Sequence, residues 1–127
     1  MTASTEPAVS RPAISFDIVV LDTDDPARLA TFYNTLLGWR TEREDDDWIT
    51  ISGGEGPRMA FQLATNHQAP TWPDPGVPQQ SHLDLKVEDL TAAAAYVESI
   101  GGRRVGDSEE DFIVFLDPSG HPFCLCD

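Results

Sequence analysis

The two halves of this sequence share one pattern when the second half is shifted back by 64 residues. Identity between the halves is low, but landmarks recur in the same order: Ile18 with His82, Asp25 with Asp89, Phe32 with Tyr96, Gly38 with Gly102, Asp47 with Asp111, Trp48 with Phe112, and Ile49 with Ile113. An internal repeat is usually the most informative feature of a sequence. Because only two copies are present, the pattern indicates one duplicated supersecondary unit and not a solenoid.

The repeated unit begins with a strand that runs directly into a helix. In residues 81–87 of the second half, apolar Leu83, Leu85 and Val87 alternate with polar His82, Asp84 and Lys86. An alternation of period two is typical of a strand with one buried face. We therefore expect the imidazole, carboxylate and ammonium to share the face that meets water or a ligand.

The first unit repeats this arrangement over residues 14–38. Residues 14–21 are rich in apolar side chains and predict a strand. Asp25 suits a helix N-cap, and Pro26 suits the first helical position because its missing N–H would have no partner there. An apolar stripe at helical spacing extends the helix to Leu37, and Gly38 is expected to end it.

The remaining pattern completes two units of the same composition. Further strands are predicted over 39–42, 48–52, 58–63, 103–106, 112–116 and 122–126, and a second helix over 91–100 follows an Asp89 cap. Residues 66–80 are rich in proline and predict a loop without regular structure. We expect an α+β fold in which two βαβββ units, about 14–65 and 81–127, form a concave cleft. They make a single domain over 13–127, preceded by a flexible tail over 1–12.

Composition narrows the range of partners and the compartment. The net charge of -14 argues against binding nucleic acid or an anionic membrane, because phosphate groups are bound by clustered Lys and Arg. No apolar run approaches the roughly 20 residues that span a bilayer, and the start of the chain lacks the apolar core of a signal peptide. We expect a cytoplasmic protein in which Cys124 and Cys126 are free thiols, since a disulfide across one intervening strand residue would be strained.

Three stretches together resemble the vicinal oxygen chelate superfamily. They are Asp-Pro-Ala-x-Leu-Ala-x-Phe-Tyr-x-x-Leu-Leu-Gly-Trp from residue 25, His-Leu-Asp-Leu-x-Val-x-Asp-Leu from residue 82, and Asp-Pro-Ser-Gly-His-Pro-Phe-Cys-Leu-Cys from residue 117. The chain is most similar to the glyoxalase-like members of a group that includes glyoxalase I, bleomycin-resistance proteins and extradiol dioxygenases. This resemblance runs from about residue 14 to 127 and implies the glyoxalase/bleomycin-resistance/dioxygenase fold, commonly in a homodimer.

The resemblance also implies where a divalent metal would bind. Enzymes of the superfamily hold the metal on the concave face with His or Glu from the first and last strands of each unit, and those positions here are Ile18, Gln62, His82 and Cys124. A slip of one residue would place Asp17 instead of Ile18. Only His82 matches, because isoleucine cannot bind a metal, Gln62 is a weak neutral ligand, and Cys124 would have to lose its proton. No cofactor is therefore expected, although Zn, Ni, Mn or Fe at His82 stays open.

The residues of the cleft suggest chemistry of their own. His82 and Asp84 share a strand face, so the carboxylate can orient the imidazole as a general base; the alternative is that His82 only makes a hydrogen bond while Asp84 and Lys86 face solvent. Trp48 is expected to pack in the core or line the ligand pocket, and Trp72 to form a pocket wall or anchor a dimer contact. His67 and His121 are expected at the surface.

The sequence is compatible with three functions. The preferred hypothesis is a small-molecule-binding protein without tightly bound metal, acting by sequestration or by acid–base chemistry at His82. The first alternative is a metal-dependent lyase, isomerase or dioxygenase of the same superfamily. The second is a structural or regulatory dimer with a vestigial site. The sequence alone does not decide whether the protein is an enzyme.

Overall fold

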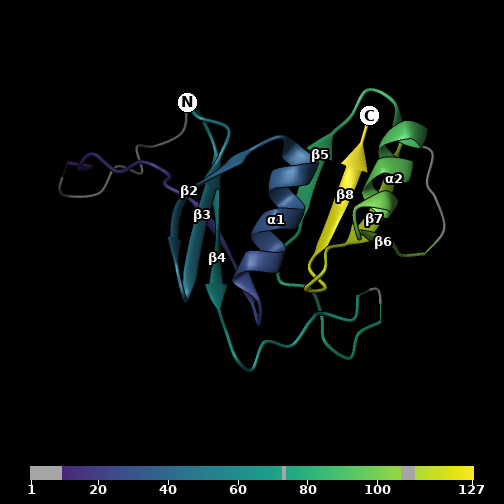
Figure 1. Ribbon diagram of the computed structural model, residues 1–127, viewed down its shortest axis with the longest axis horizontal. Helices are drawn as coiled ribbons and strands as arrows, with labels where there is room; N and C mark the ends of the chain where they lie inside the picture. The colour runs from purple at the N-terminus through teal and green to yellow at the C-terminus, as the bar shows by residue number, and fades with distance from the viewer. Residues whose placement is uncertain (1–9, 73, 107–110) are drawn as a thin grey trace, which may run out of the picture.

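The computed structural model describes residues 10–72, 74–106 and 111–127, and over these residues it contains two four-stranded sheets, each with one helix (Figure 1). The first half consists of β1 (Val19–Thr23), α1 (Pro26–Leu37), β2 (Arg40–Asp45), β3 (Trp48–Ser52) and β4 (Arg58–Leu63). The second half consists of β5 (Leu83–Lys86), α2 (Leu90–Ser99), β6 (Arg103–Arg104), β7 (Phe112–Leu116) and β8 (Pro122–Cys126). The predicted α+β fold of two βαβββ units is confirmed.

Both halves have the same topology. The first sheet has the order β1-β4-β3-β2 and the second has the order β5-β8-β7-β6. In each sheet the first strand runs parallel to the last strand of its unit, and the other neighbours are antiparallel. The long crossover that a parallel pair requires is supplied by the helix and the two strands between them.

Capping residues fix the helix starts as the sequence predicted. Asp25 accepts a hydrogen bond from the Arg28 N–H at 3.1 Å, and Asp89 accepts one from the Ala92 N–H at 3.0 Å. The first helix ends at Gly38, whose φ of 69° lies in the left-handed region that favours glycine. The second helix spans Leu90–Ser99, one residue earlier at each end than the predicted 91–100.

The first strand differs from its predicted range of 14–21. It begins at Val19 and ends at Thr23, and the side chains of Ile14 and Phe16 are 69% and 80% exposed. The physical reason is that the partner strand β4 begins at Arg58, so residues before Ile18 have no backbone to pair with. Apolar content alone predicted a longer strand than the sheet supports.

Two other strands also differ from their predicted bounds. Strand β2 extends to Asp45 beyond the predicted end at 42, because the tight turn needs only residues 46–47 to bring Asp45 opposite Trp48. The strand predicted over 103–106 is reduced to Arg103–Arg104. The predicted turn at 107–111 lies largely outside the described residues, as does most of the predicted tail; residues 10–12 are exposed and have no regular structure, and residues 66–72 and 74–80 contain no helix or strand.

The core joins both halves through α1, which lies between the two sheets (Figure 1). Tyr33 of α1 stacks on Phe61 of β4 with ring centroids 5.6 Å apart, and Phe32 contacts Phe123 of β8 at 6.0 Å. Phe123 in turn stacks on Phe115 at 5.8 Å. Each fully buried side chain of this kind stabilises the fold by about 1.5–3 kcal/mol relative to exposure, so α1 holds the halves together while leaving the opposite face of each sheet open.

None of the helices in the described part of the chain has the length and apolar character needed to cross a bilayer.

Candidate ligand-binding site

A hollow of about 470 Å³ lies over the open face of the second sheet. Its floor comes from β5, β7 and β8, and two residues of the connecting segment, Trp72 and Gln79, form one wall. The strand and terminal residues that line it are His82, Asp84, Asp111, Phe112, Val114, Pro122, Cys124, Cys126 and Asp127. This space is called the hollow.

Strand alternation and register explain why these side chains share one face. Leu83 and Leu85 turn toward the helix side and join the core, so His82 and Asp84 point the other way. Asp84 lies beside Cys124 in the parallel β5–β8 pair, and Cys124 lies beside Val114 in the antiparallel β7–β8 pair. The result is a row of carboxylate, thiol and isopropyl groups across three adjacent strands.

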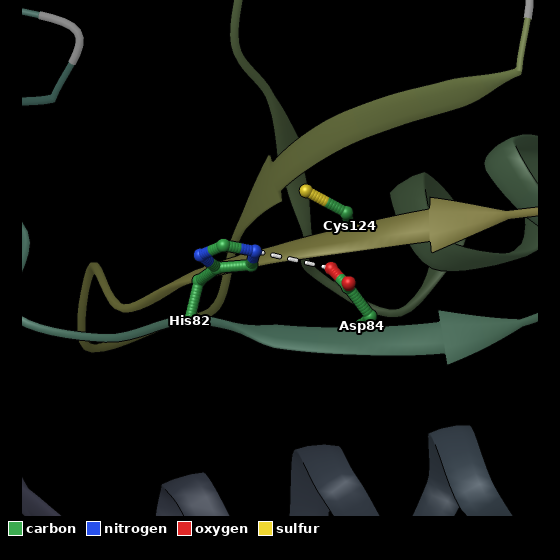
Figure 2. A group of neighbouring side chains, drawn as sticks. All are labelled: His82, Asp84 and Cys124. Carbon is green, nitrogen blue, oxygen red and sulfur yellow. Dashed lines mark ion pairs between the residues drawn. The ribbon is translucent and has the colours of Figure 1, made fainter. Parts of the chain in front are cut away.

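His82 and Asp84 form the pair that the sequence predicted. The distance from His82 Nε2 to Asp84 Oδ1 is 3.1 Å (Figure 2). The two side chains are 40% and 64% exposed, so solvent screens the interaction and leaves both groups accessible to a ligand. The carboxylate can therefore orient the imidazole, which is the arrangement that general-base chemistry requires.

Cys124 is a neutral thiol at the floor of the hollow. Burial raises the pKa of the Cys124 thiol to about 11, with further contributions from the charge of Asp84, from Cys126 and from a hydrogen bond to Asp84. The pKa of Cys126 is also raised, mainly by burial and then by the charges of Asp84 and Asp127. Both cysteines are free, as predicted, and neither resembles the low-pKa thiol of a nucleophilic cysteine.

The same three residues are also the candidate metal ligands. Donor atoms of His82, Asp84 and Cys124 all lie within 4.8 Å of one another (Figure 2). Imidazole, carboxylate and thiolate are together a donor set that suits Zn²⁺, so the residues present fit a divalent ion of this type. A bound cation would favour the thiolate of Cys124, against the effect of burial. Asp84 is a ligand candidate that the family positions in the sequence did not include.

The other predicted ligand-binding residues lie on the first half of the chain. Ile18, Trp48 and Gln62 do not line the hollow; Trp48 is half-buried and its Nε1 donates to Thr50 Oγ1 at 2.8 Å. Gln62 is exposed and pairs with Trp48 across β3 and β4. The structure therefore brings His82, Asp84, Cys124 and Trp72 together and separates them, within one chain, from the predicted residues of the first sheet.

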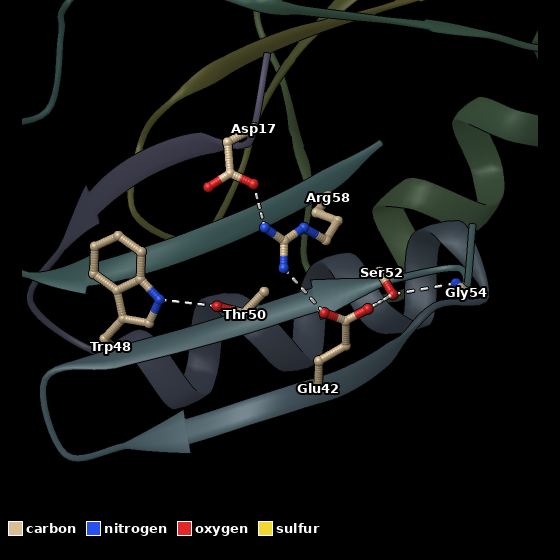
Figure 3. Close-up of polar contacts among 7 residues, drawn as sticks. All are labelled: Asp17, Glu42, Trp48, Thr50, Ser52, Gly54 and Arg58. Atoms are coloured by element: carbon tan, nitrogen blue, oxygen red, sulfur yellow. Dashed lines mark hydrogen bonds and ion pairs between the residues drawn. The ribbon is translucent and has the colours of Figure 1, made fainter. Parts of the chain in front are cut away.

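An ion-pair network occupies the open face of the first sheet. Arg58 contacts Asp17 and also Glu42, the latter at 3.3 Å, and Glu42 accepts a hydrogen bond from Ser52 (Figure 3). The hydrogen bond from Ser52 and the Arg58 guanidinium together hold the pKa of Glu42 below its ordinary value. Asp17, which a one-residue slip would place at the metal position instead of Ile18, therefore forms an ion pair with Arg58. When the two halves of the sequence are aligned with the 64-residue shift, Ala60 corresponds to Cys124 and Gln62 corresponds to Cys126.

Sequence reasoning missed several residues that line the hollow or lie close to it. Phe112 and Val114 could have been found from their alternation on the strand beside Cys124. Gln79 had no signal, because it lies in an irregular segment. His67 and His121, expected at the surface, are half-buried: their ring centroids are 4.9 Å apart, and the Nε2 atoms lie 2.9 Å from the Ser119 carbonyl and 2.6 Å from the Asp22 carbonyl, respectively. They lie beside a second cavity, of about 410 Å³, between the halves.

A family model described as a glyoxalase-like domain matches residues 18–126. This chain belongs to the glyoxalase-like domain family. The resemblance to the vicinal oxygen chelate superfamily, drawn from three sequence stretches, is confirmed by this match and by the solved structures that share the fold. None of the curated proteins matches the sequence significantly.

Three solved structures place this glyoxalase-like protein in its structural group. A glyoxalase family protein from Enterococcus faecalis is 20% identical with a TM-score of 0.68, covering 89% of this chain and 97% of its own. The fosfomycin resistance protein FosX from Mesorhizobium loti is 14% identical with a TM-score of 0.68, covering 91% and 92%. A bleomycin-binding protein in complex with bleomycin is 18% identical with a TM-score of 0.57, covering 90% and 98%. At these identities the likeness establishes the fold and leaves the ligand open.

Proposed function

We propose that this glyoxalase-like protein binds a small organic molecule in the hollow over the second sheet, without requiring a tightly bound metal. The observation that carries the proposal is the hollow itself: about 470 Å³ with apolar walls and a few convergent polar groups, the usual composition of a small-molecule site. His82 and Asp84 would orient the ligand, and an acid–base step on it would use the His82 imidazole. A structural neighbour that binds bleomycin supports the use of this fold for sequestration.

A thermal-shift screen against metabolites and antibiotics tests this proposal. A compound that binds only the native state increases the free energy of unfolding by RT ln(1 + [L]/Kd), and therefore raises the melting temperature. Val114→Phe, which narrows the hollow, should abolish the shift, whereas Tyr96→Phe, on the exposed side of α2, should leave it unchanged. If no compound in a broad panel stabilises the protein, the vestigial-site hypothesis replaces this one.

A metal-dependent reaction is the second candidate, favoured by the convergence of His82, Asp84 and Cys124. When bound there, a divalent ion would supply Lewis-acid activation of a ligand oxygen. Elemental analysis after incubation with Zn, Ni, Mn or Fe and desalting tests it. About one metal per chain, lost in His82→Ala and kept in His67→Ala, would support a metal site; a metal content at background in the unsubstituted protein, or activity that survives a strong chelator, would exclude it.

We also propose a cytoplasmic homodimer in which a second copy brings its first sheet to the hollow. Two observations support it: Ile18, Trp48 and Gln62 do not line the hollow within one chain, and Ile14 and Phe16, which precede β1 in the sequence, expose large apolar side chains. The two free thiols favour a reducing compartment. Sedimentation should give a dimer that Phe16→Ser weakens and Tyr96→Ser, on the exposed side of α2, does not.

A further inference from the structure

Negatively charged groups outnumber positively charged ones among the described residues that line the hollow. Asp84, Asp111 and Asp127 line it, and no Lys or Arg belongs to its described lining. Protonation of His82 would add one positive charge and still leave the carboxylates in excess. Among the described residues, Asp84 forms an ion pair only with that imidazole, and its side chain is 64% exposed. A ligand entering this space therefore meets a negative potential.

The uncharged walls of the hollow suit the body of an organic cation. Trp72 and Phe112 line it, and Phe112 is 38% exposed, so aromatic surface is available for apolar and cation–π contact.

We propose that the hollow selects organic cations, specifically amines whose ammonium group meets the carboxylates while an aromatic or aliphatic body lies against Trp72 and Phe112. This inference rests on the proposed small-molecule function and names its ligand class. Anionic and neutral molecules of the same shape are disfavoured, because the described lining residues of this chain offer them acceptors and negative charge but no Lys or Arg.

Three probes of matched shape test the ligand class: phenethylammonium, phenethyl alcohol and hydrocinnamate. Dissociation constants come from chemical-shift titrations of the ¹⁵N-labelled protein, which also locate the affected residues. We expect the ammonium to bind at least about fivefold more tightly than the alcohol, equivalent to about 1 kcal/mol, and the carboxylate to bind most weakly. Raising the salt concentration should reduce this preference, because the contributing carboxylates are exposed.

Substitutions locate the origin of the preference. The double variant Asp84→Asn, Asp111→Asn should bring the ammonium and the alcohol to similar affinity. Asp46→Asn, in the β2–β3 turn and outside the hollow, is the matched control and should change nothing. Equal affinities in the unsubstituted protein, or tighter binding of the carboxylate, would overturn the cation proposal while leaving the hollow as a binding site.

A second measurement decides the question if all three probes bind too weakly to titrate. The chain has two cysteines, and both line the hollow. Their reaction rates with trimethylammonioethyl and sulfonatoethyl methanethiosulfonate, each divided by the rate of free cysteine, measure the local potential. A cation-to-anion ratio above about five, lowered in the Asp84→Asn, Asp111→Asn variant, supports the proposal; a ratio near or below one overturns it. Failure of the broad thermal screen, by contrast, would count against the binding function itself.

Discussion

The hydroxyl of Tyr33 in α1 donates a hydrogen bond of 2.7 Å to the buried carboxylate of Asp117, which follows β7 in the other half of the chain. The second carboxylate oxygen accepts the backbone N–H groups of Ser119 and His121 at 2.9 and 3.0 Å. Ser119 also shares a 2.6 Å hydrogen bond with Thr23 at the end of β1. One buried side chain thus orders the 117–121 turn and links it to the first unit, so the relative position of the two sheets depends on it.

Removing the donor should destabilise the protein in a pH-dependent way. Burial raises the pKa of Asp117 above its ordinary value, against the hydrogen bond from Tyr33, which lowers it. A carboxyl group with a raised folded pKa adds stability below its unfolded pKa and loses that contribution as the pH rises through the folded value. Tyr33→Phe raises the folded pKa of Asp117 further, so its cost should be about 1–3 kcal/mol at pH 7 and smaller near pH 4.

Urea denaturation at the two pH values measures this difference. Tyr96→Phe is the matched control, because its hydroxyl lies in an exposed contact with the Thr35 carbonyl. It should cost little and show no pH dependence. An equal loss for Tyr33→Phe at both pH values would mean that Asp117 is not the charged partner.

The two helix caps should contribute equally although they lie in different units. Asp25→Ala and Asp89→Ala each remove a hydrogen bond to the first turn and should each lower the free energy of unfolding by about 1 kcal/mol, within a range of roughly 0.5–2. Serine at either position should recover most of the loss, because its hydroxyl can accept the same bond. Asp24→Ala, next to the first cap, should change stability by less than about 0.5 kcal/mol in the same denaturation series.

Gly38 and Gly102 occupy equivalent positions in the repeat, but replacing each with alanine should lower the free energy of unfolding for a different reason. A Cβ at Gly102 would lie 2.3 Å from Val97 Cγ1, whereas one at Gly38 meets nothing within 4 Å but requires a φ of 69°. Gly102→Ala should cost about 1–3 kcal/mol through overpacking, and Gly38→Ala about 1 kcal/mol through backbone strain. Val97→Ala should partly rescue Gly102→Ala and leave Gly38→Ala unaffected, a coupling that a double-mutant cycle measures. Additive losses would contradict the clash.

Local features of the fold followed from the sequence because their causes are local. Asp25, Asp89 and Gly38 act on backbone groups within a few residues, so cap chemistry predicted the helices to within one residue. The 64-residue repeat then predicted that both halves share one topology. The true start of β1 could not be predicted, because it depends on where the distant strand β4 begins to pair.

The candidate site followed from the sequence only where its residues are adjacent along the chain. Asp84 lies on β5 and His82 directly precedes that strand, so β5 is shorter than the alternation over 81–87 predicted, but the alternation still placed the two side chains on one face. The position of Ile18, Trp48 and Gln62 away from the hollow depends on how the sheets pack around α1, which periodicity does not encode. The His67–His121 pair and the buried Gln79 amide come from irregular segments, whose conformation no periodic pattern constrains.

The reactivity of Cys124 should reveal its environment directly. Because its pKa is raised to about 11, the thiol should react slowly with iodoacetamide near neutral pH and faster as the pH rises. The unfolded chain ionises this thiol at the ordinary value of 9.0, so the free energy of unfolding should begin to fall as the pH passes that value. Asp84→Asn removes the negative charge and one of the two acceptor oxygens, so the pKa of Cys124 should fall part of the way while burial, the largest cause, keeps it raised. Alkylation followed by mass spectrometry in a Cys126→Ser background should show rates increased severalfold by Asp84→Asn and unchanged by Asp111→Asn, which does not contribute to that pKa. Labelling as fast as that of the unfolded chain at neutral pH would contradict the buried, acidic surroundings on which the ligand preference also depends.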